Sequence, residues 1–199
     1  MTGALLRLLI LALLVAAGSA AARADQQKIA IGWLSQTEKR SWPLSYLDQP
    51  PSDEGIEGAR LGIADNNTTG NFTGQSFDLV ESVVPENGDV AAAFRNLTGK
   101  GISLIVTDLA ASALLKVADL PEARQVTIFN TAAPDDRLRA QDCRANVLHL
   151  LPSRAMLADA LVQYLVFKRW KNLLLVEGKS EGDHEFAADI RHAAEKFQA

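Results

Sequence analysis

Three short, continuous runs of apolar residues constrain the fold of this chain most. They are ISLIV from Ile102, VTIF from Val126 and LLLV from Leu173. Because successive side chains of a strand point to opposite faces, a strand built from such a run needs apolar cover on both sides. That pattern is typical of parallel sheets packed between two layers of helices. The sequence therefore predicts an α/β fold.

The rest of the chain alternates strand and helix patterns around these runs. Lys28–Leu34, Ser76–Val83 and Val147–Leu150 are predicted strands, and helices are predicted at 55–65, 89–98, 110–118, 153–168 and 183–197. Asp53 and Asp89 occupy the expected N-cap positions of the first two helices. The Asn- and Gly-rich stretch after residue 65 has the composition of a turn. The alternation predicts an open, doubly wound, mostly parallel sheet, whose ligands bind outside the carboxyl ends of the strands.

The last two predicted helices have apolar stripes that we expect to be buried. In the first of them the stripe is Leu157, Leu161, Tyr164 and Leu165, and in the second it is Phe186, Ile190, Ala194 and Phe197. Helices of this kind pack one face against a sheet or another helix.

The N-terminus has the layout of a signal peptide. Arg7 precedes the apolar run LLILALLVAAG, and small residues follow, ending in Ala22-Arg23-Ala24. This is an A-x-A-like cleavage site, and the run is too short to span a bilayer. We expect residues 1–24 to be removed, with Asp25 as the new N-terminus. No cysteine lies near that point, so we expect no lipid anchor, and the predicted location is the periplasm.

Charge and cysteine content restrict the partners. Removal of residues 1–24 takes away two basic residues and no acidic one, so the formal charge changes from −4 to −6. An acidic chain with scattered Lys and Arg is a poor candidate for nucleic-acid binding. Cys143 is the only cysteine, so we expect no disulfide partner, and we interpret it as a partly buried, unreactive residue.

Two patterns resemble functional motifs but lack the required spacing. Gly178-Lys179-Ser180 follows a predicted strand, yet Leu173 stands where a phosphate-binding P-loop needs its first glycine. The acidic residues around His184 do not place two strong metal ligands at i, i+4, and we interpret them as helix N-terminal charges. No nucleophile with a base and no G-x-S-x-G elbow is present, which argues against an exported hydrolase. The sequence predicts no enzyme, metal site or cofactor.

The order of the segments carries a family resemblance. After the signal peptide come KIAIGWL, GIADNN, FDLVESVV and ISLIVTDLAAS, followed by VTIFNTAAPDDRL, LHLLPSRAMLADALVQYLV and KNLLLVEGKSEGDHEFAADIRHAAEKF. Over residues 28–199 this order resembles the leucine/isoleucine/valine-binding family of ABC-importer receptors. APDDRL, DCRANVLH and PSRAMLADAL resemble in particular a subgroup associated with pyrroloquinoline-quinone-dependent alcohol oxidation.

The resemblance implies two lobes that close on a solute about a hinge. Residues 25–150 would form lobe one, and residues 151–199 the beginning of a truncated lobe two, because the chain stops at Ala199 where a further strand is expected. The implied function is an extracytoplasmic solute-binding component of an ABC importer. Its partners would be a small-molecule solute and a permease in the inner membrane. A branched-chain amino acid receptor and a ligand-binding sensor domain of the same fold are the alternatives.

The resemblance also implies the ligand-contacting loops, which are 107–112 and 130–134. The candidate residues there are Thr107, Asp108, Ala111, Ser112, Asn130, Thr131 and Ala133. In amino-acid receptors of the family a Ser and a Thr hydroxyl in these loops hold the ligand carboxylate. Ala111 and Pro134 occupy the matching positions, and a shift of one residue would restore Ser112 or Thr131.

Two aromatic residues complete the predicted site, and the loops suggest the solute. Trp42 and Tyr46, in the long first loop, are expected to supply an apolar or stacking wall, although packing of that loop onto the domain explains them equally well. Without the two hydroxyl donors, an unpaired carboxylate would be costly to bury. We therefore predict a small alcohol-derived or otherwise less charged metabolite, and not a simple branched-chain amino acid.

Overall fold

A computed structural model describes residues 26–37, 51, 53–170 and 172–198 of the chain. In chain order the elements are β1 (Gln27–Gln36), α2 (Ile56–Thr73), β2 (Gln75–Val84), α3 (Val90–Gly99), β3 (Leu104–Asp108), α4 (Ala111–Ala118), the 3-10 helix η1 (Pro121–Gln125), β4 (Thr127–Asn130), the 3-10 helix η2 (Asp136–Arg139), β5 (Val147–His149), α5 (Arg154–Phe167) and α6 (Glu181–Phe197). The α/β fold predicted from the sequence is confirmed.

The five strands form one parallel sheet in the order β2-β1-β3-β4-β5. The long β1 pairs with β2 over ten residues, from Gln27 opposite Gln75 to Gln36 opposite Val84. On its other side β1 pairs with β3, with Ser35 opposite Asp108. The chain thus leaves β1 on one side to form β2 and then crosses to the other side for β3. The point where the strand order reverses lies between β1 and β3.

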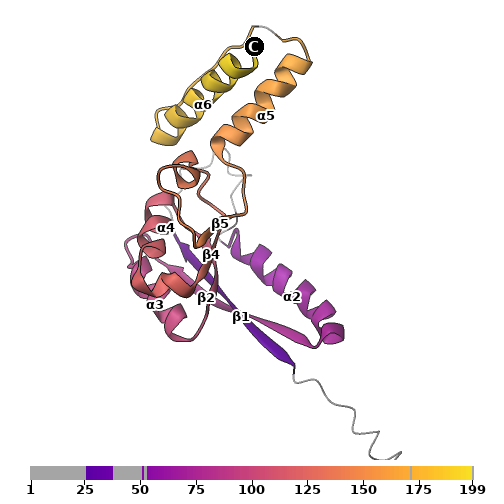
Figure 1. Cartoon of the computed structure of the whole chain (residues 1–199), viewed down its shortest axis with the longest axis vertical. Helices are drawn as coiled ribbons and strands as arrows, with labels where there is room; N and C mark the ends of the chain where they lie inside the picture. The colour runs from indigo at the N-terminus through magenta and orange to yellow at the C-terminus, as the bar shows by residue number, and fades with distance from the viewer. Residues whose placement is uncertain (1–25, 38–50, 52, 171, 199) are drawn as a thin grey trace, which may run out of the picture.

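Helices cover both faces of the sheet (Figure 1). A Cβ at Gly32 of β1 would meet Leu97 of α3 at 3.4 Å, whereas the neighbouring side chains of Ile31 and Trp33 face α2. The main core lies on the α3 and α4 side. Its fully buried members include Leu34, Phe94, Leu97, Ile105, Leu114, Val117 and Ile128. The predicted cap at Asp89 is confirmed, because its carboxylate accepts a hydrogen bond from the Ala91 amide at 3.0 Å.

Helix α2 differs from its prediction at both ends. Asp53 is not its cap; Gly55 is, at φ +86°, with no side-chain hydrogen bond to the first turn. The predicted turn after residue 65 is helical instead, and the helix continues to Thr73. The side chain of Asn67 explains part of this, because it receives the Phe77 amide at 2.7 Å and donates to the Phe77 carbonyl at 2.8 Å. A polar residue that bonds the next strand stabilises the helical position that its propensity alone disfavours.

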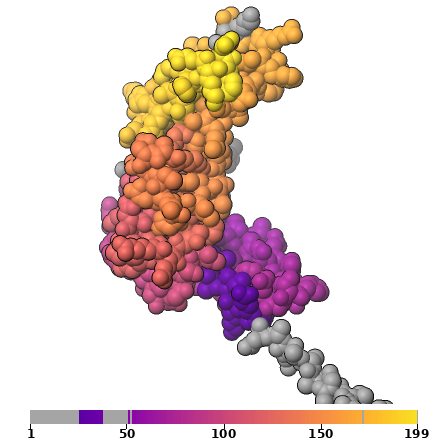
Figure 2. All heavy atoms as spheres, viewed as in Figure 1, coloured from indigo at the N-terminus to yellow at the C-terminus, as the bar shows by residue number. Residues whose placement is uncertain are grey.

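Helices α5 and α6 lie side by side and extend away from the sheet, as the orange and yellow end of Figure 2 shows. Their shared core is Ala158, Val162 and Ala193, with Phe186, Ile190 and Phe197 packed against it. The stripe predicted for α5 is wrong: Leu157, Leu161 and Tyr164 are 46%, 43% and 53% exposed. Helix α5 has apolar residues on several faces, and α6 covers only the face that carries Ala158 and Val162.

The predicted strand at Leu173 is also wrong. Residues 172–178 have no strand assignment, and no strand in the described part of the chain pairs with them. Their apolar side chains are exposed, Leu174 at 91% and Val176 at 83%. A strand needs a neighbour to receive its backbone hydrogen bonds, and here none is within reach.

Two further observations concern membrane-spanning helices and the cysteine. Across the described ranges, none of the helices has the length and apolarity needed to cross a bilayer. Cys143 is exposed and unpaired, which corrects the expectation that it is partly buried. The signal peptide and the residue Asp25 lie outside the described residues.

Candidate functional site

Two hollows meet at the carboxyl edge of the sheet, where the strand order reverses between β1 and β3. In open α/β sheets this is the position where ligands bind. Asp108, the last residue of β3, lines both hollows. Its position in the register is opposite Ser35 near the end of β1. The strand topology therefore puts one acidic side chain at the junction of the two spaces.

The first space, here called the apolar hollow, lies between α2 and the sheet and has a volume of about 570 Å³. Trp33 forms one wall, only 4% exposed, with its indole N–H donating to the Ser35 hydroxyl at 3.1 Å. The lining comes from β1, β2, β3, α2 and two loops: Ile31, Trp33, Glu54, Gly55, Ala59, Gly62, Ile63, Leu79, Val106, Asp108 and Thr131.

Glycine is required where α2 begins beside this hollow. A Cβ at Gly55 would lie 3.2 Å from Oδ2 of Asp108 and 3.3 Å from the Trp33 ring, and the backbone there has φ +86°. The dihedral angle is one that ordinary side chains rarely adopt, and a Cβ would also lie closer to Asp108 and Trp33 than most Cβ contacts do. Gly55 thus lets the start of α2 approach Trp33 and Asp108 closely.

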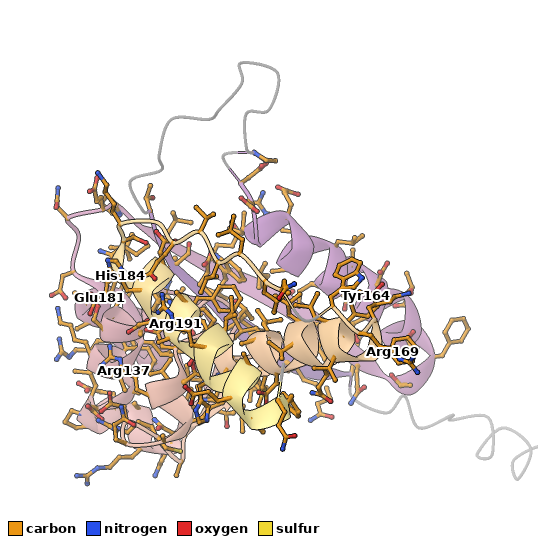
Figure 3. All side chains as sticks on the ribbon, turned by 90° about the horizontal axis from the view of Figure 1, so that it is seen from above. Arg137, Tyr164, Arg169, Glu181, His184 and Arg191 are labelled. Atoms are coloured by element: carbon orange, nitrogen blue, oxygen red, sulfur yellow. The ribbon has the colours of Figure 1, made fainter. Side chains whose placement is uncertain are left out.

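The second space, here called the polar hollow, has a volume of about 470 Å³. It lies between the loops after β3 and β4 and the starts of α5 and α6. Its lining is Asp108, Leu109, Ala110, Ala111, Ser112, Ala132, Ala133, Pro134, Asp135, Arg137, Arg154 and Glu181. Arg137 and Glu181 are labelled on the same side of the molecule in Figure 3.

Charges at this hollow are paired across elements. Nη1 of Arg154, at the start of α5, lies 3.5 Å from the Asp135 carboxylate and 2.9 Å from that of Glu185 on α6. Arg137 forms a 2.9 Å pair with Asp142. Helix α4 begins at Ala111 without a side-chain cap, so its N-terminal amides face this region. The polar hollow therefore combines cations and helix amides with carboxylates.

Two of the predicted site residues lie beneath the hollows instead of on their surface. Thr107 and Asn130 are both fully buried. The Thr107 hydroxyl donates to the Phe129 carbonyl at 3.2 Å. The Asn130 amide nitrogen donates to the Ala133 carbonyl at 2.7 Å, and its oxygen accepts from the amides of Ala132 and Ala133 at 3.2 and 2.9 Å. These side chains fix the shape of the loop after β4.

The other predicted residues divide between the two spaces. Ala111, Ser112 and Ala133 line the polar hollow, Thr131 lines the apolar hollow and Asp108 lines both. The Thr131 hydroxyl donates to the Thr107 carbonyl at 3.0 Å, which ties the two loops together. Trp42 and Tyr46 lie outside the described residues.

Sequence reasoning missed Trp33 and Arg154. Trp33 belongs to a strand whose alternate side chains face α2, so the period-2 pattern of KIAIGWL is the signal that identifies it. Arg154 has no comparable signal, because its partners Asp135 and Glu185 are brought to it only by the fold.

The motif-like patterns have structural roles. Ser180 caps α6 in a reciprocal capping box with Asp183, whose amide donates to the Ser180 hydroxyl at 3.1 Å. His184 pairs with Glu177, which also pairs with Arg191 at 2.5 Å. Hydrogen bonds from the side chains of His184 and Arg191 lower the pKa of Glu177. Over the described residues, no group of His, Cys, Asp and Glu has the arrangement of a metal site.

Comparison with solved structures shows that this fold is similar to that of ABC-transporter substrate-binding proteins. A protein of that description from Desulfitobacterium hafniense has 16% identity and a TM-score of 0.60, over 86% of this chain and 47% of its own. A branched-chain amino acid ABC-transporter periplasmic ligand-binding protein from Burkholderia xenovorans has 19% identity and a TM-score of 0.65, over 84% and 43%. A branched-chain amino acid transporter substrate-binding protein from Streptococcus pneumoniae, solved with isoleucine, has 17% identity and a TM-score of 0.57, over 84% and 47%.

The chain spans less than half the length of these three structures. This partial coverage of the neighbours' length fits one lobe of their fold. No protein-family model matches the sequence, and a comparison with curated proteins found no match.

Proposed function

We propose that the chain is the solute-binding part of a periplasmic receptor that serves an ABC importer. The observation that carries this proposal is the pair of hollows joined at Asp108, at the carboxyl edge of a sheet whose structural neighbours are substrate-binding proteins. In this proposal Ala111, Ser112, Thr131 and Ala133 contact the solute beside Asp108. Thr107 and Asn130 act as positioning residues, because their polar atoms are used within the protein.

We further propose that residues 25–150 are lobe one and residues 151–199 the beginning of lobe two. Two features support this division. The link between them follows β5, the edge strand of the sheet. Beyond it, α5 presents exposed apolar residues of the kind that a helix normally buries against a sheet. Arg154 and Glu181, at the starts of α5 and α6, already border the polar hollow, and closure of two such lobes about the link would bring the rest of a second wall over it.

Calorimetry tests the two-lobe proposal. The proposed cleft has two walls, of which residues 25–199 supply the first and only the start of the second, so this piece is expected to bind solute weakly or not at all. The longer protein, if the reading frame continues past codon 199 into a second lobe, is expected to bind tightly with one solute per chain. Tight, stoichiometric binding by residues 25–199 alone would contradict the proposal.

The proposed solute is a small metabolite without a free carboxylate, of the alcohol-derived kind. The support is chemical, since Ala111 and Pro134 offer no side-chain donor and Pro134 has no backbone N–H. The link to alcohol oxidation depends on the sequence resemblance alone. A thermal-shift screen of the two-lobed protein distinguishes the solutes: alcohols and their oxidation products should raise the melting temperature, whereas stabilisation by leucine, isoleucine or valine alone would contradict the proposal.

A branched-chain amino acid is the second candidate solute, and two observations favour it. The Streptococcus pneumoniae neighbour was solved with isoleucine, and a Desulfitobacterium hafniense neighbour was solved with leucine. In addition, the uncapped N-terminus of α4 and the guanidinium of Arg154 border the polar hollow, and both attract a carboxylate. The same thermal-shift screen decides between the candidates.

A further inference from the structure

We propose that the contact between the helix pair α5–α6 and the segment 134–139 is an acid-sensitive clasp, which is closed while Asp136 and Asp189 share a proton and releases when that proton leaves. The clasp sets the position of the helix pair relative to the sheet. Because Arg154 and Glu181 of the pair border the polar hollow, release also moves that wall of the hollow. This inference goes beyond the proposed function and concerns the chain without solute.

The helix pair has a core of its own, separate from that of the sheet. Its buried residues Ala158, Val162 and Ala193 pack only with other side chains of the pair. The main core, as far as the chain is described, contains no residue of either helix. In Figure 1 the first turns of both helices are the ends that lie nearer to the sheet. Apolar packing within the two cores therefore does not join the pair to the sheet, and the polar contacts at this end decide how the pair is held.

The segment 134–139 makes these contacts with the first turn of α5. The Pro134 carbonyl accepts a hydrogen bond from the Arg154 amide at 3.0 Å. The two carboxylate oxygens of Asp136 lie 3.1 and 3.3 Å from the amide nitrogen of Ala155, which donates to them. Amides in the first turn of a helix have no partner within the helix, so these acceptors hold α5 by groups that it leaves free.

Helix α6 reaches the same segment through Asp189. The Asp136 side chain lies within hydrogen-bonding reach of the Asp189 carboxyl. One oxygen of Asp189 is buried, and among the described residues no donor bonds to it. Two ionised carboxylates in contact repel each other and offer only acceptors. A single proton held between Asp136 and Asp189 supplies the donor and removes the repulsion.

The other charged groups that act on Asp189 are Arg154 on α5 and Glu185 on α6. They pair with each other at 2.9 Å, and Arg154 also lies 3.5 Å from the Asp135 carboxylate. Burial, and then Asp136, raise the pKa of Asp189 to about 6, with a further rise from Glu185 and an opposing effect of Arg154. The closed clasp therefore favours neutral Asp189. Its stabilisation is complete below the ordinary aspartate pKa and is lost as pH rises through about 6.

The distance between the helix pair and the sheet reports the state of the clasp. Cys143, the only cysteine, is exposed in the loop before β5 and takes one spin label. Glu195→Cys, at an exposed position of α6, takes the other. Pulsed electron spin resonance on the chain without solute measures the closed and released populations. Their ratio should fall about tenfold from pH 5 to pH 7.5, given a pKa of about 6 in the closed state and an ordinary one after release.

Asparagine at either position of the pair should remove this pH response. In Asp189→Asn or Asp136→Asn the amide donates permanently where the parent needs a proton, so the closed population should be the same at pH 5 and pH 7.5. Asp159→Asn is the matched control. Asp159 pairs with Lys196 between α5 and α6 and lies outside the clasp, so this variant should keep the response of the parent.

Identical distance distributions of the parent at the two pH values would overturn the clasp. So would a pH response that persists in both asparagine variants of the pair, or one that disappears in Asp159→Asn. Each of these results would leave the receptor proposal standing, because that proposal is judged by solute binding to the two-lobed protein.

Discussion

The side-chain amide nitrogen of Asn130 lies 2.9 Å from Nδ1 of His149, its register partner on the edge strand β5. The Asn130 oxygen accepts from two backbone amides, which fixes the amide orientation and makes its nitrogen the donor. Nδ1 of His149 must therefore accept, and the imidazole is neutral with its proton on Nε2. One buried side chain thus links β4, β5 and the loop that borders the polar hollow.

The first prediction concerns acid stability. Burial, and then the positive charge of Arg139, lower the pKa of His149. A lowered pKa means that the neutral ring is favoured in the folded state, so its stabilisation is complete above the ordinary histidine pKa and is lost as pH falls through the folded value. The His149 contribution to the free energy of unfolding, measured by urea unfolding as the difference between the parent and a His149 variant, should be about 1 kcal/mol smaller at pH 5 than at pH 8, the value of one hydrogen bond.

The control for this prediction is His149→Gln, which removes the titrating group. The variant is expected to be less stable than the parent at pH 8 and to lose less on acidification. A parent and a variant with the same pH dependence between pH 8 and 5 would show that His149 is not responsible.

Asp189 on α6 gives a second prediction of the opposite sign. One of its carboxyl oxygens is buried without a hydrogen-bond donor, and burial together with the nearby Asp136 raises the pKa of Asp189 to about 6. The folded state favours the protonated form of Asp189. Protonated Asp189 therefore stabilises the fold at low pH, and this contribution is lost as pH rises through about 6. Glu185 adds to the raised pKa, and Arg154 opposes it.

Asp189→Asn should therefore stabilise the chain at pH 8, because the amide is neutral and donates toward Asp136. The expected gain is about 1 kcal/mol, reduced from the full shift because the site is partly exposed to solvent. At pH 4.5 parent and variant should melt at similar temperatures. A gain of the same size at both pH values would exclude titration of Asp189 as its cause.

Continuous apolar runs predicted the centre of the sheet correctly, because two-sided burial is a local property of sequence. ISLIV and VTIF became β3 and β4, and the cap at Asp89 formed as expected. The same pattern at Leu173 did not give a strand, since a strand also depends on a neighbour. A local run of apolar residues indicates that a segment suits a strand, but it does not indicate whether a neighbouring strand is present to pair with it.

Side-chain roles at the site were less accessible from sequence. Asn130 stands in a predicted ligand loop, but its position opposite His149 makes it a structural link. Trp33 lies in a predicted strand, and only the small residues of α2 opposite it create a hollow there. Both features depend on contacts between segments far apart in the chain.

The third prediction is the position of signal cleavage. The sequence Ala22-Arg23-Ala24 places the new N-terminus at Asp25. N-terminal sequencing of the exported protein should begin with Asp-Gln-Gln. Replacing Ala24 with Arg should block cleavage, because the peptidase accepts only a small residue there, whereas the same change at Gln26 should have no effect. Exported material that still begins at Met1 would contradict the assignment.

The last prediction concerns the apolar segment 173–176. Exposure alternates along it, with Leu173 and Leu175 at 42% and 37% and Leu174 and Val176 at 91% and 83%. A period of two is typical of a strand, whose side chains point alternately to two faces. The less exposed face, with Leu173 and Leu175, is the one that lies toward the rest of the protein. In this chain, Leu174→Ser with Val176→Ser should change the free energy of unfolding by less than about 0.5 kcal/mol, because exposed positions contribute little.

In a protein that completes lobe two, the same pair should become core residues. The double substitution is then expected to destabilise by about 3–5 kcal/mol, the cost of burying two hydroxyls and losing two apolar side chains. Leu173→Ser with Leu175→Ser is the matched control, and it should destabilise both proteins. Urea unfolding of the four variants measures these differences. An equally small effect of the Leu174 and Val176 pair in both proteins would show that no further polypeptide packs on this segment.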